Sequence, residues 1–340
     1  LNQSADSQAR QPLHLEQPPA ELCGAAHRLC ARLVDYLGEH QADAALQELL
    51  FELLRFLNLV EHFDSHSLCD LSRARRGCAR LSIQNLVPAD FLAPRFNRAQ
   101  SCVLFSATLQ PPQYHLDLLG LESDTRWQEI ESPFSAQQLE VKLVSEVSTR
   151  LLHRAASIKP LVRLIAHQYR SRPANYLVYF SSFAYLDAVC TSFESDHPDV
   201  PVWRQQPGMR DAARRAFIDN FQEEGAGVGF AVLGGAFAEG IDLPGRRLTG
   251  VFIATLGLPP FDARHRILSE RLQSRYGQGY EYTWLYPGLQ KVCQAAGRVI
   301  RTPQDQGIVV LIDDRFARKE VQALLPQWWQ PGEVQPIPEP

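Results

Sequence analysis

The sequence predicts a doubly wound α/β fold, in which helices cover both faces of a parallel sheet. Short apolar runs typical of buried strands recur in the second half of the chain, and helix-like segments separate several of them. Small polar residues follow the ends of these runs. Sheets of this kind carry their sites at the carboxyl ends of the strands, so we expect the functional residues there.

An N-terminal helical segment is predicted to precede the sheet. From Ala20 to about Val60, leucines recur every three to four residues, which is the spacing of an amphipathic helix. Such stripes are far more often core than part of a cofactor site, so no chemistry is assigned to them. The apolar run Ser101–Ser106 then predicts a first buried parallel strand.

Further strands and helices continue the pattern. The strands are expected at Tyr176–Phe180, Val228–Leu233, Leu248–Ala254 and Ile308–Ile312. The helices are expected at Leu151–Tyr169, Met209–Gln222, Ala263–Tyr276 and Leu289–Ile300. Pro287 and Gly288 are typical of the start of the last helix.

The composition excludes several classes of protein. The 340 residues are 45% hydrophobic, which is enough to bury a sizeable core, and their formal net charge of -4 shows no basic excess. Contacts with nucleic acid must therefore come from a local patch. The seven cysteines are scattered without a C-x-x-C pair, and no segment reads as a membrane span or a secretion signal. We expect a cytoplasmic protein with reduced thiols.

The strongest candidate for chemistry is the segment Gln294–Arg301, which reads Q-A-A-G-R-V-I-R. Within one helix, the spacing i, i+4, i+7 would place Gln294, Arg298 and Arg301 on one face. Two guanidinium groups suit phosphate oxygens, and Gly297 with two alanines lets the helix lie close to another body. A surface arginine pair beside a tightly packed turn explains the spacing equally well.

A glycine-rich loop is predicted after the strand Val228–Leu233. It begins at Gly234 and Gly235 and reaches the run E-G-I-D at 239–242, where two carboxylates stand three residues apart. Glycines let backbone amides approach a ligand, and paired acids can orient water, metal-bound water or an arginine. A turn-rich connection with solvated acids is the commoner case.

Two further strand ends carry hydroxyl groups. They are Ser106, Ala107 and Thr108 after the first predicted strand, and Ser181, Ser182 and Phe183 after the second. Such residues usually cap a helix or form a turn. Their functional interpretation is hydrogen bonding to phosphates or relay between domains.

Taken in order, these four segments resemble motifs III, IV, V and VI of superfamily-two helicases. With D-D-R-F at 313–316 they are more narrowly similar to the XPD/DinG branch, whose members are ATP-dependent 5'-3' DNA helicases. The resemblance covers about residues 80–320. It implies that the sheet is RecA-like and that the protein acts in DNA repair or replication.

The resemblance also implies roles for individual residues. Arg298 or Arg301 would be an arginine finger that meets the γ-phosphate of ATP held by another domain. Five more residues would face the nucleotide: Gln294, Gly297, Glu239, Gly240 and Asp242. Of these, Gly240 and Asp242 would also link the nucleotide site to DNA. Ser106, Ala107 and Thr108 would couple hydrolysis to strand separation, and Ser181, Ser182 and Phe183 would contact single-stranded DNA.

By the same resemblance the chain divides into four parts. Residues 1–80 would be the remnant of a helical Arch, 81–135 the end of a first RecA-like domain, 136–330 the second RecA-like domain and 331–340 a tail. Single-stranded or forked DNA and the rest of the first domain are the expected partners, without a membrane.

The phosphate-binding and metal-binding motifs of the family are missing from this sequence. A phosphate loop needs G-x-x-x-x-G-K-[ST], yet none of the lysines follows a glycine, and no Asp-Glu pair supplies an acidic box. We therefore interpret the chain as the C-terminal portion of a longer helicase and expect it to be inactive alone. ATP and Mg²⁺ would be bound mainly by the missing domain, and an iron–sulfur cluster would be possible only in the missing part.

The sequence offers three other interpretations. The run G-A-G-V-G at 225–229 precedes a strand, whereas a dinucleotide fingerprint follows one. The histidines and cysteines between residues 62 and 78 lack the spacing of a zinc finger or ribbon, so no metal site is expected. A non-catalytic RecA-like module that binds DNA or regulates without ATP hydrolysis stays open as the alternative.

Overall fold

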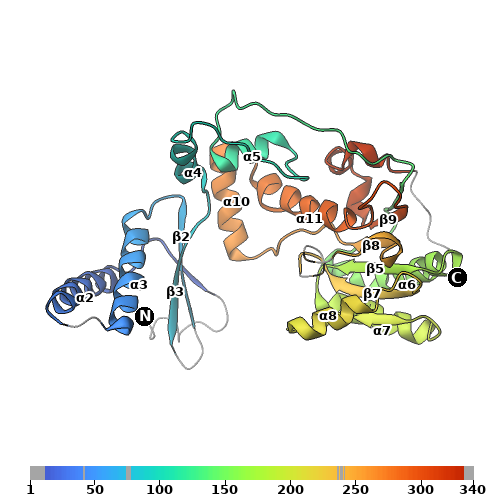
Figure 1. Cartoon of the computed structure of the whole chain (residues 1–340), viewed down its shortest axis with the longest axis horizontal. Helices are drawn as coiled ribbons and strands as arrows, with labels where there is room; N and C mark the ends of the chain where they lie inside the picture. Colours follow the sequence, from blue (N-terminus) through green and yellow to red (C-terminus); the bar gives the residue numbers. More distant parts are fainter. Residues whose placement is uncertain are drawn as a thin grey trace. The chain divides into compact units, whose positions relative to one another are not determined.

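The structure, a computed structural model, describes residues 12–40, 43–73, 78–235, 237, 240 and 242–332 (Figure 1). Its internal contacts divide the chain into two compact units. The first comprises residues 1–103 and 116–123, and the second comprises residues 104–115 and 124–340. Helix α5 (Pro112–Leu119) spans the division.

The first unit contains a pair of helices, as the leucine spacing predicts. They are α2 (Ala20–Glu39) and α3 (Ala44–Glu61). Asp43 begins α3, because its carboxylate accepts a hydrogen bond of 2.8 Å from the backbone N–H of Ala45. The two helices pack through a small cluster formed by buried Ala26, Cys30 and Leu57.

A small antiparallel sheet in the first unit was not predicted. It is formed in the order β1 (Leu13–Leu15), β2 (Ser67–Arg73) and β3 (Ala79–Asn85), and α4 (Ala89–Phe96) follows it. His14 Nδ1 and Asp70 Oδ1 lie 2.6 Å apart across β1 and β2. Among the described residues up to 80, the helices are α2 and α3.

The second unit is built on a six-stranded sheet in which every pair of neighbours is parallel, in the order β4-β9-β8-β5-β7-β6. The strands are β4 (Leu139–Val144), β5 (Asn175–Phe180), β6 (Val202–Arg204), β7 (Gly227–Val232), β8 (Gly250–Ala254) and β9 (Gly307–Ile312). All four later strands of the prediction are present. The edge strands β4 and β6 were not predicted.

Helices cover both faces of this sheet. Along β5, Tyr176 and Val178 pack in the same cluster as residues of α6 (Arg154–Ser171) and α7 (Phe183–Asp196). Leu177 of the same strand packs in a second cluster. That cluster contains residues of α8 (Asp211–Asp219) and α11 (Tyr286–Ala296). The doubly wound α/β fold is confirmed.

The remaining elements are one long helix and several short ones. They are η2 (Leu151–His153), η3 (Gly245–Arg247), α10 (Ala263–Tyr276), the π-helix η4 (Glu281–Leu285), η5 (Asp314–Ala317), α12 (Lys319–Gln322) and η6 (Gln327–Trp329). After η6, the N–H of Gly332 donates to the carbonyl of Val141, so the chain covers part of the outer edge of β4. Of the predicted tail, residues 333–340 lie outside the described residues.

The predicted strand Ser101–Ser106 is wrong. These residues have no regular structure, and Val103 and Phe105 are 81% and 89% exposed. A continuous apolar run forms a parallel strand only when other strands pair with it and both faces are covered. Neither sheet of the described chain takes up this run.

The last predicted helix is four residues too long, because α11 ends at Ala296. Gly297 forms the cap, and its N–H donates to the carbonyl of Cys293 at 2.9 Å. Beyond it, the carboxylate of Asp305 accepts hydrogen bonds of 2.7 Å from the N–H groups of Arg301 and Thr302, which turns the chain away from the helix. The expected single helical face of Gln294, Arg298 and Arg301 is therefore wrong.

Candidate functional site

A buried tyrosine of the neighbouring strand β5 holds the loop after β7. The hydroxyl of Tyr179 donates to the carbonyl of Phe237 at 2.7 Å, and both side chains are buried. Burial raises the pKa of Tyr179, and the positive charge of Arg298 opposes this rise. Tyr179 therefore holds the loop and is within reach of the charge of Arg298, although Arg298 stands 61 residues after Phe237 in the sequence. The sequence analysis did not predict a role for Phe237.

Arg301 and Asp242 bring the two most promising segments of the sequence together. Arg301 Nε lies 3.5 Å from Asp242 Oδ1, and their side chains are 32% and 77% exposed. An ion pair this exposed contributes little stability, so Arg301 is able to exchange its partner for an incoming anion. Gly240 is exposed in the same loop, whereas Glu239 lies outside the described residues.

Gln294 and Gly297 occupy the end of α11. Gln294 is half-buried in the last turn of the helix, and Gly297 is exposed at its cap. The arginines follow within four residues, so the helix end presents amide and guanidinium donors close together in the chain. Of these donors, Arg301 is paired with the exposed carboxylate of Asp242.

Ser106, Ala107 and Thr108 lie against α11 in the second unit. The N–H of Thr108 donates to Ser106 Oγ at 3.2 Å, which makes the segment a hydroxyl-stabilised turn. Gln290 Nε2 of α11 donates to the Thr108 carbonyl at 3.4 Å and lies 3.2 Å from His115 Nε2. Ala107 is exposed.

The contact through Gln290 was missed by the sequence analysis, although one signal was available. Gln290 stands one helical turn before Gln294 and shares its face of α11. Burial lowers the pKa of His115, opposed by a hydrogen bond with the Gln110 backbone, so the imidazole is held largely neutral near pH 7.

Ser181, Ser182 and Phe183 have a structural role as well as an exposed position. Ser182 is the N-cap of α7 and accepts a hydrogen bond of 3.3 Å from the N–H of Tyr185. The Ser181 hydroxyl is exposed and accepts a hydrogen bond of 2.8 Å from Arg154. Phe183 is half-buried at the start of the helix.

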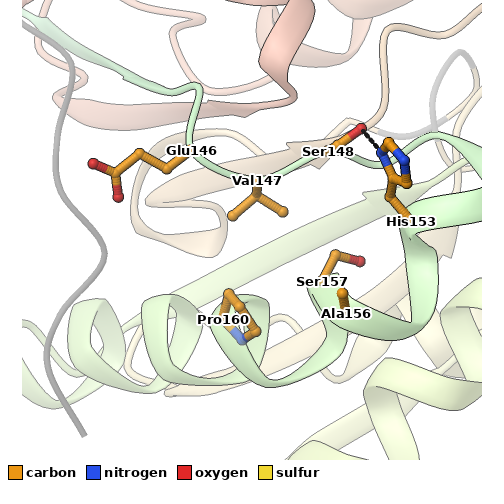
Figure 2. A pocket seen from close by; sticks show the side chains of 7 residues that line it. All are labelled: Glu146, Val147, Ser148, His153, Ala156, Ser157 and Pro160. Atoms are coloured by element: carbon orange, nitrogen blue, oxygen red, sulfur yellow. Dashed lines mark hydrogen bonds between the residues drawn. The ribbon is translucent and has the colours of Figure 1, made fainter.

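A small hollow at the end of β4 was not predicted (Figure 2). Its rim comes from the loop after β4 and from the first turns of α6, and Ser148 Oγ lies 3.0 Å from His153 Nδ1. The lining residues are Glu146, Val147, Ser148, His153, Ala156, Ser157 and Pro160. With one carboxylate and no cation in its lining, the hollow is a poor site for a phosphate.

The segment D-D-R-F at 313–316 stabilises the carboxyl edge of the sheet. Asp313 is buried at the end of β9 and accepts hydrogen bonds from Arg315 Nε at 2.5 Å and from the N–H of Thr149 at 3.1 Å. Burial alone would raise the pKa of Asp313, but the hydrogen bonds and charge of Arg315 and the hydrogen bond from Thr149 lower it overall. The exposed pair Arg150–Asp314, with an N–O distance of 2.8 Å, lies beside it.

Neither a metal cluster nor a membrane span is found in the described part of the chain. Within it, no three His, Cys, Asp or Glu side chains are grouped so that they could hold a metal ion. None of its helices combines the length and apolar character that crossing a bilayer requires.

Comparison with known proteins decides the family. Residues 165–332 match the profile of the helicase C-terminal domain. These residues are the C-terminal domain of an XPD/DinG-like helicase of superfamily two.

Relatives support this assignment along most of the chain. The chain is 28% identical to a probable ATP-dependent helicase of Methanocaldococcus jannaschii, over 62% of this chain and 34% of that protein. It is also 28% identical to the ATP-dependent DNA helicase DinG of Photobacterium profundum, over 66% of this chain and 33% of that protein. The chain thus spans about a third of the length of the relatives it matches.

A solved structure of apo XPD has the same fold. It aligns with 92% of this chain and 63% of its own, with a TM-score of 0.63 and 22% sequence identity. The six-stranded sheet of the helicase domain is therefore RecA-like. The structure brings Asp242 to Arg301 and Phe237 to Tyr179, whereas Thr108 contacts Gln290 and Ser181 contacts Arg154.

Proposed function

We propose that this chain supplies the C-terminal half of an ATP-dependent 5'-3' DNA helicase that unwinds single-stranded or forked DNA substrates in repair or replication. In this proposal residues 136–330 are the second RecA-like domain, and residues 81–135 complete a first RecA-like domain that binds ATP. Residues 1–80 belong to the Arch, and 331–340 form a tail. The protein works in the cytoplasm.

The pairing of Asp242 with Arg301 is the observation that carries the proposal. It joins the glycine-rich loop to the arginine segment at the carboxyl edge of a parallel sheet, where α/β proteins bind ligands. The charge of Arg298 also acts on the pKa of Tyr179, whose hydroxyl holds Phe237 of the same loop. A guanidinium group whose exposed partner can be exchanged suits a phosphoryl group whose charge is spread over several oxygens.

Each predicted residue has a part in the proposed reaction. Arg298 and Arg301 stabilise charge on the transferred γ-phosphoryl group, and Gln294 senses the nucleotide beside them. The other residues that face the nucleotide are Glu239, Gly240, Asp242 and Gly297. Hydrolysis is coupled to strand separation by Ser106, Ala107 and Thr108. Single-stranded DNA is contacted by Ser181, Ser182 and Phe183.

The donor set fits one side of a nucleotide site but not a magnesium site. Arginine and glutamine donate to phosphate oxygens, whereas Mg²⁺ requires carboxylates, and the described residues include no grouped acids for it. When bound with ATP, Mg²⁺ neutralises charge on the phosphates. Its ligands would therefore come from the first domain, and an iron–sulfur cluster would also lie in that missing part.

The exposed run Cys102–Phe105 supports the need for another domain. Four consecutive apolar residues are typical of a strand buried on both faces, yet Val103 and Phe105 are almost fully exposed. The run leads directly into Ser106, the start of the coupling motif. It suits a strand that is completed by a parallel sheet belonging to the first RecA-like domain.

The test compares hydrolysis with nucleotide binding in the complete helicase. Arg301→Ala and Arg298→Ala should lower kcat by about a hundredfold or more and change ATP affinity by less than about tenfold, because finger contacts strengthen in the transition state. Equal losses in both quantities would contradict the role. The chain alone should show no DNA-stimulated ATP hydrolysis.

The second candidate is a non-catalytic RecA-like module that binds DNA or regulates a partner. This alternative also accounts for the missing phosphate loop and acidic box. Adding the purified first domain of a related helicase separates the two functions. Restored hydrolysis that depends on Arg298 supports the helicase, and DNA binding without any hydrolysis supports the module.

A further inference from the structure

We propose that Gly234 and Gly235, together with Lys291 and Gln205, form a binding site for one phosphate group. The nature of the ligand rests on the proposed function, whereas the geometry of the site does not. Gly234 and Gly235 begin the loop after β7, Gln205 directly follows β6, and Lys291 lies on α11. Three elements therefore meet at this loop.

Gly234 allows the stem of Lys291 to lie against the backbone of the loop. Its φ of 79° falls in the left-handed region that favours glycine. A methyl group on Gly234 would lie 3.3 Å from Cδ and 3.8 Å from Nζ of Lys291. Within the described residues, the N–H groups of Gly234 and Gly235 donate no hydrogen bond to a protein acceptor. The loop thus offers two amide donors beside an ammonium group.

The ammonium group of Lys291 has no acidic partner among the described side chains. Lysines elsewhere differ, since Lys142 lies 3.2 Å from Glu140 and Lys159 lies 2.7 Å from Asp196. Lys291 is also half-buried, so its charge is less screened than that of a lysine in open solvent. A half-buried cation without a counter-ion favours an anionic ligand.

Gln205 adds an amide donor whose direction is fixed. The side chain is only 9% exposed, and its Oε1 accepts a hydrogen bond of 2.7 Å from the N–H of Val232. This contact assigns the amide, so Nε2 is the free end, 3.7 Å from where a methyl group on Gly235 would lie. Nε2 has no acceptor in the described part of the protein. Nε2 is not among the buried side-chain nitrogens that lack a partner, so this fixed donor is accessible to a ligand.

The combination of donors specifies an oxyanion. Two backbone amides, one carboxamide and one ammonium group supply hydrogen bonds and a single positive charge, with no acceptor among the groups named. The described acid of the same loop, Asp242, is paired with Arg301. A phosphate group matches this set in charge and in the number of acceptor oxygens. It belongs either to the backbone of single-stranded DNA or to a nucleotide.

The experiment measures two ligands against four forms of this chain. Binding of a labelled dT15 oligonucleotide is followed by fluorescence anisotropy across a range of salt, and binding of ATP is followed by calorimetry. The forms are the wild type, Lys291→Gln, Lys291→Arg and the control Lys159→Gln. Lys159 also loses one positive charge but lies on α6, which covers the opposite face of the sheet.

Lys291→Gln should weaken one of the two ligands by about tenfold, since it removes a charge-assisted hydrogen bond, and Lys291→Arg should retain most of the affinity. A weaker affinity for dT15, with a slope of log affinity against log salt concentration that is smaller by about 0.7, identifies a DNA phosphate. A loss confined to ATP identifies a nucleotide phosphate. Both results support the site.

Three outcomes would overturn it. They are unchanged binding of both ligands by Lys291→Gln, an equal loss in Lys159→Gln, and a wild type that binds neither ligand. None of these outcomes touches the arginine-finger test on kcat, so the proposed function and this site fail independently.

Discussion

Replacing Asp313 by asparagine should destabilise the second unit by about 3 kcal/mol, the lower end of the range for breaking a buried ion pair. Asp313 is fully buried and accepts hydrogen bonds from the side chain and backbone of both Thr149 and Arg315. An asparagine keeps one acceptor oxygen but turns an NH₂ group toward these donors. The guanidinium group of Arg315, only 14% exposed, would also lose its counter-charge.

Urea unfolding followed by tryptophan fluorescence measures this change, because all five tryptophans lie in the second unit. The matched control is Asp314→Asn, which removes an exposed pair with Arg150 and should cost less than about 1 kcal/mol. Equal destabilisation by both substitutions would refute the argument that burial sets the energy.

The pH dependence gives a second check on Asp313. Because its pKa is lower in the folded state, its stabilising contribution is complete above the unfolded pKa of about 4. The contribution is lost as the pH falls through the folded pKa. The difference in the free energy of unfolding between wild type and Asp313→Asn should therefore be constant from pH 7 to about pH 5 and should become smaller below about pH 4. A gap that widens in acid would contradict the assigned direction.

Three further predictions concern the surface. At pH 8 a thiol reagent should modify exposed Cys78 and Cys102 quickly and Cys293 slowly, because burial raises the pKa of Cys293 to about 12; the reverse order would contradict this. Val103→Asn with Phe105→Ser should change the stability of the chain by less than about 0.5 kcal/mol and weaken its association with a first RecA-like domain, whereas a large loss of stability would show that the run is packed. The affinity of the chain for single-stranded DNA should fall linearly on a double logarithmic plot against salt, and a flat plot would exclude phosphate contacts.

The sequence predicted the strands that are buried on both faces and missed the others. β5, β7, β8 and β9 are continuous apolar runs, which parallel strands in the middle of a sheet require. β4 alternates apolar residues with Glu140 and Lys142, because it lies at an edge, and this weaker pattern was overlooked. The failure at Ser101–Ser106 has another cause, since a strand depends on partners that the local sequence does not contain.

The site was predictable in its order along the chain but not in its contacts. Gly240, Asp242, Gln294 and Arg301 were selected by motif order. The pairing of Asp242 with Arg301 depends on how β7 and α11 pack, which no local pattern encodes. The helix length was misjudged because the residue that turns the chain, Asp305, lies beyond the motif.

The two margins of the six-stranded sheet have a consequence for how the protein associates. β6 has only three residues, and its Arg204 is engaged by Glu194 and Asp187, while the free side of β4 is partly occupied by the N–H of Gly332. Short, charged or covered margins discourage strand addition from a second molecule. Strands of a second molecule should therefore not add to either margin of this sheet, even at high protein concentration.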